Sequence, residues 1–186
     1  MAPPLNGRFI RQALVHIPFD GQPWEGVLMR TSTATRRPAK NKAVSREEGI
    51  AAFWRFCSPR QSLTDSERLQ QIKVGFPADL IQAFRLAFDL QEHHLETLFH
   101  ASISTLERRQ REHKNLDPVA SERLDRIASV SHLTEGVFDN QVRAVQWMSM
   151  KNKALGGIAP IMLCETEIGA KRVRRILQAL EWGGAA

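Results

Sequence analysis

A chain of 186 residues with 42% hydrophobic content is long enough to fold around one core or two small ones. No apolar run approaches the roughly 20 residues of a membrane span, and residues 1–28 lack a secretory signal pattern, so we expect a cytoplasmic protein with no membrane partner. Cys57 and Cys164 are too few for a disulfide framework or a metal site. Cys164 has apolar neighbours and should pack as a small apolar residue.

The positive charge lies in the first third of the chain. Residues 1–62 contain ten Lys and Arg against four Asp and Glu, whereas residues 63–186 contain sixteen of each sign. Residues 30–46 hold no acidic and no aromatic residue, so they bury too little surface to offset the entropy of ordering. We therefore expect 1–62 to be a basic, partly disordered extension with a mobile arm over 30–46. The arm would attract nucleic-acid phosphates, or it is a solvated linker.

From Phe76 onward the apolar residues recur at helical spacing, and no segment alternates apolar and polar residues, so the sequence predicts an all-α fold. Helices are expected in "FPADLIQAFRLAFDL" and over 91–99. After the connection "HAS", Ser102 is a good N-cap for "ISTLERRQRE". Two short helices joined by about three residues are the outline of a helix-turn-helix, which we place at 63–115.

The second helix of this pair carries a candidate DNA-binding face. Steps of about 100° per residue place polar side chains on the side opposite Ile103 and Leu106. Short hydroxyl groups can approach base edges, an arginine can pair with guanine, and flanking arginines can reach phosphates. The candidate DNA-binding residues are Ser104, Thr105, Arg108, Arg109 and Arg111. A solvated surface helix has the same composition, so that alternative stays open.

Residues 116–186 are expected to form a second helical domain. Asp117 and Pro118 begin a helix that breaks at Asp139 and Asn140. The core positions expected in the following helix are Val142, Val145 and Met148. Gly156 and Gly157 permit backbone shapes that side chains forbid, Pro160 can start a short helix, and Thr166 and Glu167 suit the start of the last helix.

The last helix is expected to leave a tryptophan on its outer side. Its apolar residues from Val173 to Leu180 share one face, and Trp182 projects opposite them beside Lys171 and Arg175. Exposed aromatics next to arginine are common at interfaces. The alternative is a frayed end in which Trp182 folds back on the core.

Catalytic chemistry is not evident in the sequence. His93, Glu96 and His100 would align on one side of a helix, but they face solvent with no fourth ligand nearby, so a solvated surface is preferred over a metal site. The chain contains no phosphate-binding loop of the Walker type and no GxSxG elbow. We predict a protein that is not an enzyme and uses no metal or cofactor.

The segment from about Gly75 to Gly183 contains a series of motifs in a fixed order. These are an acid-Arg-Leu group at 122–124, "VFD" at 137–139, a helix ending in Trp147, "LGGIAP" at 155–160, "ETEIG" at 165–169 and a last helix ending at Gly183. In this order the segment resembles the Xre/MbcA/ParS antitoxins, which are partners of RES-domain toxins in type II toxin–antitoxin systems. It departs from the family at His100, where Gly is usual, and at Met148, where Leu is usual.

The resemblance implies an antitoxin that covers the active site of a RES toxin. RES toxins resemble ADP-ribosyltransferases and consume NAD, whereas the antitoxin itself binds no NAD. The resemblance also implies a homodimer that binds the operator DNA of its own operon. A helix-turn-helix transcription regulator whose C-terminal domain only dimerises, without a toxin partner, is the alternative.

The toxin-binding surface is expected in the C-terminal part, where the two glycines would let the chain turn closely against its neighbours and so aim the last helix. The candidate toxin-binding residues are Leu155, Gly156, Gly157, Pro160, Lys171, Arg175, Trp182, Gly183 and Gly184.

Overall fold

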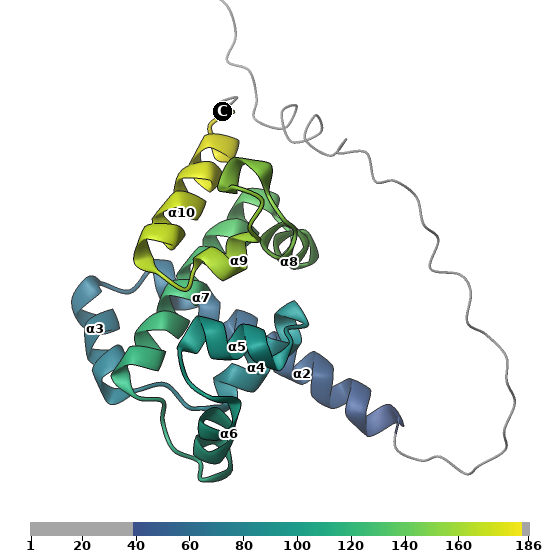
Figure 1. Cartoon of the computed structure of the whole chain (residues 1–186), viewed down its shortest axis with the longest axis vertical. Coiled ribbons are helices and arrows are strands. Elements are labelled where there is room, and N and C mark those ends of the chain that lie inside the picture. The colour runs from purple at the N-terminus through teal and green to yellow at the C-terminus, as the bar shows by residue number, and fades with distance from the viewer. Residues whose placement is uncertain (1–38, 184–186) are drawn as a thin grey trace, which may run out of the picture. The chain divides into compact units, whose positions relative to one another are not determined.

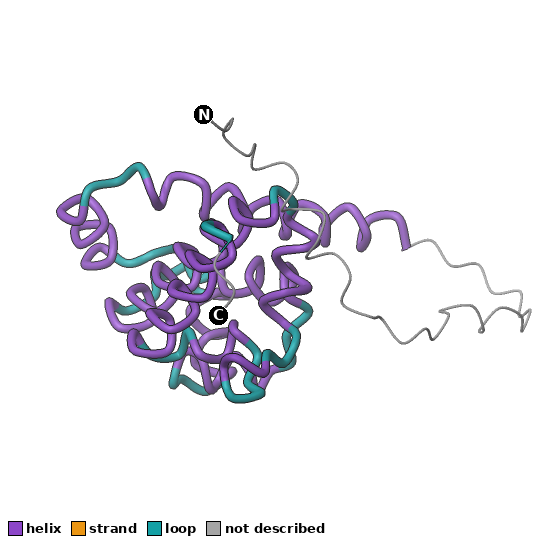
Figure 2. Tube along the Cα trace, turned by 90° about the horizontal axis from the view of Figure 1, so that it is seen from above, coloured by secondary structure: helices purple, strands orange, loops and turns teal. Residues whose placement is uncertain are grey.

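The computed structural model describes residues 39–183, and every regular element in that range is helical (Figure 2). The all-α expectation is confirmed. None of the described helices is long and apolar enough to span a membrane. The first elements are α2 (Ala39–Cys57), the 3₁₀ helix η1 (Ser58–Gln61), α3 (Asp65–Val74), α4 (Asp79–Phe88), α5 (Glu92–Phe99) and α6 (Ile103–Arg111). The remaining elements are α7 (Pro118–Phe138), α8 (Gln141–Ser149), the 3₁₀ helix η2 (Lys153–Leu155), α9 (Pro160–Leu163) and α10 (Glu167–Glu181).

Helix α7 lies between two groups of helices (Figure 1). It packs against α2, α3 and α5 on one side and against α8 and α10 on the other. Asp117 caps its start by accepting a hydrogen bond from the amide of Ala120, and Asp139 ends it in a left-handed conformation, as the sequence predicts. Because α7 belongs to both groups, the division of the chain at 115/116 stays a prediction.

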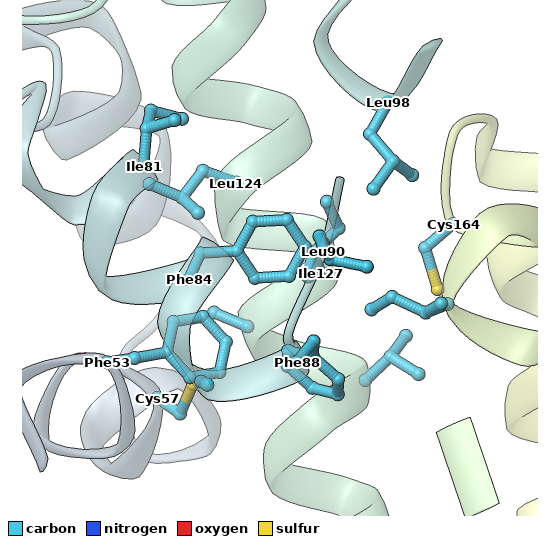
Figure 3. Packing of buried hydrophobic residues seen from close by; sticks show 14 of the residues in the cluster. Phe53, Cys57, Ile81, Phe84, Phe88, Leu90, Leu98, Leu124, Ile127 and Cys164 are labelled. Atoms are coloured by element: carbon cyan, nitrogen blue, oxygen red, sulfur yellow. The ribbon is translucent and has the colours of Figure 1, made fainter. Parts of the chain in front are cut away.

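Helix α2 is part of the hydrophobic core. Phe53, Trp54 and Cys57 are buried, and the ring of Phe53 lies 5.5 Å from that of Phe84 and 5.6 Å from that of Phe88 (Figure 3). Aromatic pairs at these separations add to the free energy of burial.

The expected mobile arm over 30–46 is therefore wrong for residues 39–46, which are helical. The later turns of α2 pack their apolar side on α4, and this packing stabilises the whole helix. The basic composition of residues 30–46 gives no sign of this packing. The expected extension over 1–62 likewise contains core residues from Phe53 onward. Residues 1–38 lie outside the described range.

A buried ionic cluster joins the N-terminal elements to α7. Nη1 of Arg60 donates to Oδ1 of Asp125 at 3.0 Å, and Arg68 from α3 donates to the other carboxylate oxygen. The guanidinium of Arg60 also lies 4.3 Å from the ring centre of Phe56 and 5.1 Å from that of Phe76. Two arginines thus compensate one buried carboxylate, which makes the position of η1 against α7 specific.

The core of the C-terminal helices differs at one predicted position. Val142 is exposed, which corrects the prediction, because the core side of α8 is centred on Ala144 and Met148 and Val142 lies on the opposite side. Met148 is buried as predicted, and Cys164 is fully buried. Burial raises the pKa of the Cys164 thiol to about 12, so this thiol stays protonated at neutral pH.

Candidate functional site

The turn between α5 and α6 is built by two local hydrogen bonds and one residue in the left-handed conformation. Ser102 caps α6 by accepting a hydrogen bond from the amide of Thr105, and the carboxylate of Glu96 accepts one from the amide of Ile103 at 2.9 Å. His100 ends α5 in a left-handed conformation, with φ 48° and ψ 41°. That is the conformation for which glycine is favoured, so the backbone at His100 has the geometry that would suit the glycine expected from the family resemblance.

The outward face of α6 is formed by Ser104, Arg108 and Arg111, which are all exposed. Steps of about 100° place these three side chains within one narrow sector, opposite the buried Leu106. Thr105 is half-buried, and its hydroxyl lies 2.9 Å from that of Ser102. The face therefore offers two arginines and one short hydroxyl to a ligand.

Arg109 points away from this face. Its Nη1 donates to the backbone carbonyl of Asn115 at 2.9 Å, and its Nη2 lies 3.6 Å from the carboxylate of Asp117. Both partners lie in the loop that leads into α7. The charge of Arg109 is therefore engaged within the fold, and its expected contact with phosphates stays a prediction.

The "LGGIAP" segment forms a loop that closes on Asn152. The carbonyl of Asn152 accepts hydrogen bonds from the amides of Leu155 and Gly157, and its amide donates to the carbonyl of Ile158 at 3.2 Å. Gly156 and Gly157 have φ of 75° and 77°, which glycine adopts without strain. An added Cβ at either glycine would meet nothing within 4 Å. The expectation that the chain turns closely against its neighbours at Gly156 and Gly157 is therefore wrong. Glycine is favoured at these two positions because of their positive φ.

Two of the candidate toxin-binding side chains lie inside the domain. Leu155 is 1% exposed and Pro160 is also buried, so both support the fold and neither offers a surface to a partner. Sequence alone could not separate them from the exposed glycines of the same loop. Gly183 is exposed, and Gly184 lies outside the described range.

Helix α10 presents the remaining candidates to solvent. Its buried side packs on α7 and α9, and Lys171, Arg175 and Trp182 are exposed on the other side. Trp182 is 83% exposed and ends the helix, so it does not fold back on the core. An exposed aromatic ring at the end of a helix face that also carries cations can anchor a partner protein.

The start of α10 depends on a close contact with α9. Thr166 caps the helix by accepting a hydrogen bond from the amide of Gly169 at 3.1 Å. A Cβ added at Gly169 would lie 2.0 Å from the backbone carbonyl oxygen of Leu163. The glycine of the "ETEIG" segment is therefore required for the close approach of α10 to α9.

Arg126 is a positioning residue that the sequence did not reveal. Its side chain is buried and donates from Nε to the carbonyl of Cys164 at 3.0 Å and from Nη2 to that of Glu165 at 2.9 Å. Its Nη1 lies 3.2 Å from the carboxylate of Glu122, a member of the acid-Arg-Leu group. A lone arginine in a helix gives no sequence signal of contacts some forty residues away.

Two of the three residues considered for a metal site have other partners. Glu96 accepts from the amide of Ile103, and His100 lies at hydrogen-bonding distance from the carboxylate of Glu165. Among residues 45–183, no group of three or more His, Cys, Asp or Glu side chains is placed to hold a metal ion.

Comparison with known proteins identifies both halves of the described chain. Residues 67–129 match the antitoxin Xre-like helix-turn-helix domain, and residues 134–183 match the antitoxin Xre/MbcA/ParS C-terminal toxin-binding domain. A protein described as antitoxin Xre, from Yersinia enterocolitica, is 31% identical over 145 residues, which cover 77% of this chain and 91% of that protein. The chain belongs to the Xre family of antitoxins.

The two family domains of this Xre antitoxin correspond to the surfaces described above. The helix-turn-helix match contains α4, α5 and α6 together with most of α7, and the toxin-binding match contains α8, α9 and α10. Helix α2 precedes both matches although it contributes to the core. The outer faces of α6 and α10 are therefore the candidate DNA-binding and toxin-binding surfaces of this antitoxin.

Proposed function

We propose that this antitoxin neutralises a RES-domain toxin, an NAD-consuming protein similar to ADP-ribosyltransferases, by covering its active site with α10. The observation that carries the proposal is the exposure of Trp182 beside Arg175 within the region that matches a toxin-binding domain. The resemblance of residues 75–183 to partners of RES toxins supports the class of the toxin. Occlusion requires a fixed shape and no catalytic group on this chain.

The physical basis is the apolar surface that Trp182 leaves in water. A tryptophan side chain buries about 150–250 Å² when it is enclosed, and tryptophan and arginine are enriched among the residues that dominate binding energy. The folded chain gains little from Trp182, because 83% of this residue is exposed. Removing it should therefore weaken binding to the toxin while leaving the fold nearly unchanged.

Co-expression with the RES-domain toxin that the proposal expects in the neighbouring reading frame tests it. We expect the wild-type chain to restore growth and cellular NAD, and Trp182→Ala or a chain lacking residues 181–186 to protect poorly. Val119→Ala is the matched control, since it removes an exposed apolar side chain from the start of α7. Full protection by the shortened chain would rule out the covering role of the α10 end.

We propose further that α6 binds operator DNA and that the chain acts as a homodimer. The exposed Ser104, Arg108 and Arg111 support base and phosphate contacts by one helix face. A dimer would present two such helices to half-sites about 34 Å apart on a palindromic operator. A regulator without a toxin partner remains the competing function, and the absence of a toxin gene beside this one would favour it.

A further inference from the structure

The outer face of α10 carries more than the residues predicted from sequence. Its core side consists of Gly169, Ala170, Val173 and Leu177. On the opposite side, steps of about 100° per residue bring together residues spaced three and four apart along the helix. These are Ile168, Lys171, Arg175, Gln178 and Trp182, all of them exposed, and we call them the α10 stripe.

Both ends of the α10 stripe are apolar. Ile168 is 79% exposed and Trp182 is 83% exposed, the highest values among the large hydrophobic side chains of the described range. At a rise of about 1.5 Å per residue, they lie about 21 Å apart along the helix. Two such side chains on one helix face are costly to leave in water, since burying each is worth a few kcal/mol.

The fold does not require an apolar residue at 168. Thr166 caps the helix, Gly169 makes the close contact with α9, and Glu167 pairs with Arg174 on the flank. Each of these contacts comes from a neighbour of Ile168. A polar side chain at this position would serve the folded chain at least as well, so its apolar character points to a partner.

The middle of the α10 stripe is basic and uncompensated. Neither Lys171 nor Arg175 forms an ion pair with another residue of 45–183, whereas the neighbouring Arg174 is paired with Glu167. Charges left free on a binding surface give specificity when the partner presents the opposite sign. The complementary surface is thus acidic in its centre and apolar at both ends.

We infer that α10 docks lengthwise in an acidic groove of the toxin, with Ile168 and Trp182 as two apolar anchors at the ends of the contact. This rests on the proposed function, because it assigns the partner's surface at the same toxin-binding domain. It differs from a plug formed by the C-terminal tip alone, which would leave Ile168 in water. Figure 1 shows α10 along the edge of the described helices, so its whole length is accessible from one side.

The test measures the affinity of the full chain for the purified RES-domain toxin that the proposed function expects in the neighbouring reading frame. The variants are Ile168→Ser, Trp182→Ser and Arg175→Glu, with Val119→Ser as the matched control. Circular dichroism and thermal unfolding verify that each variant is folded. We expect Ile168→Ser and Trp182→Ser each to weaken binding by about tenfold or more, and Val119→Ser to change it by less than about twofold. Arg175→Glu should weaken binding and reduce its dependence on salt.

The outcomes separate the inference from the proposed function. If Trp182→Ser weakens binding and Ile168→Ser does not, the toxin still contacts the end of α10 but lengthwise docking is overturned. If neither variant changes the affinity, or the wild-type chain does not bind the toxin, the proposed function itself fails. If Ile168→Ser alters only self-association, measured by sedimentation, the α10 stripe is a contact between two copies of this chain and the inference is overturned.

Discussion

Nε2 of His100 lies 2.5 Å from a carboxylate oxygen of Glu165, which joins the turn before α6 to the turn before α10. Arg126 holds the same second turn through its backbone carbonyls. The helices that carry the candidate DNA-binding and toxin-binding surfaces, α6 and α10, therefore begin within a few residues of one shared junction. Their far ends lie well apart in Figure 1.

Substitutions of His100 should separate two contributions to stability. One is the free-energy cost of its left-handed backbone conformation, and the other is the stabilisation from its contact with Glu165. A non-glycine residue in the left-handed region costs about 1–2 kcal/mol, and an exposed ion pair contributes at most about 1 kcal/mol. His100→Gly relieves the first and loses the second, so its free energy of unfolding should stay within about 1 kcal/mol of wild type. His100→Ala keeps the strain and loses the contact, so it should be less stable than His100→Gly. Urea unfolding measures both, and the reverse order would contradict this account.

The helix-turn-helix was predictable because its signals are local. The cap at Ser102, the apolar spacing around Leu106 and the three-residue connection all lie within a few residues of one another. The contacts of Arg109 with the loop before α7 and of His100 with Glu165 depend on the tertiary fold. No local pattern records them.

Helix α2 was missed for a different reason. Ile50, Phe53, Trp54 and Cys57 recur at i, i+3, i+4 and i+7, which is the apolar face of a helix. The excess of positive charge in residues 1–62 predicts one basic extension, and this short periodicity therefore received no weight. At the candidate toxin-binding surface, helical spacing correctly predicted that Lys171, Arg175 and Trp182 are exposed, but nothing in "LGGIAP" distinguished the buried Leu155 from the exposed glycines.

Removing the carboxylate of Asp125 should destabilise the fold strongly. Asp125→Ala leaves Arg60 buried without its partner, which typically costs about 3–5 kcal/mol. Arg68→Ala should cost less, because Arg68 is partly exposed and Arg60 still compensates the carboxylate. Chemical unfolding of the full chain gives both values. Equal stability of Asp125→Ala and wild type would mean that η1 is not held to α7 by this cluster.

Arg108→Ala should weaken binding to operator DNA selectively. If Arg108 pairs with a base, the loss is about 1–3 kcal/mol on the operator and much smaller on random DNA. Arg109→Ala is the matched comparison: it should lower the free energy of unfolding, because it removes the contacts with Asn115 and Asp117, and it should affect DNA binding less. Fluorescence anisotropy at two salt concentrations measures these effects. An equal loss for Arg108→Ala on operator and random DNA is inconsistent with base reading.

The start of α5 should become less stable as the pH falls below neutrality. Partial burial, and then the neighbouring His93, lower the pKa of His94, whose Nδ1 accepts a hydrogen bond from the amide of Gln91. A pKa that is lower in the folded than in the unfolded chain means that folding releases protons. The loss of folding free energy caused by His94 is therefore absent well above the ordinary histidine pKa of about 6.5, and it grows as the pH falls through that value.

His94→Gln should remove this pH dependence while keeping an acceptor for the amide of Gln91. The free energies of unfolding of wild type and His94→Gln are compared between pH 8 and pH 5, about 1.5 units either side of the ordinary histidine pKa. We expect the wild-type value to fall more steeply on the acid side. His93→Gln should flatten the curve less, because His93 is the smaller cause of the shift. Parallel curves for wild type and His94→Gln would show that His94 does not titrate differently on folding.

Two glycine-to-alanine substitutions should have opposite effects on stability. Gly169→Ala places a Cβ against the backbone carbonyl of Leu163, so α10 must move away from α9. The overpacking should cost about 1–3 kcal/mol, more than the gain in helix propensity of about 1 kcal/mol. Gly136→Ala is the control: it lies exposed in α7, an added Cβ meets nothing within 4 Å, and it should stabilise the chain by about 0.5–1 kcal/mol.

The same pair tests whether the position of α10 matters for the toxin. Since Gly169 precedes most of the α10 stripe, a displaced helix start should weaken toxin binding by Gly169→Ala beyond any loss of folded protein. Gly136→Ala should leave toxin binding unchanged. Thermal unfolding and titration with the toxin under conditions where both variants are folded measure the two effects. A stable Gly169→Ala with wild-type affinity would mean that α10 does not need its close contact with α9.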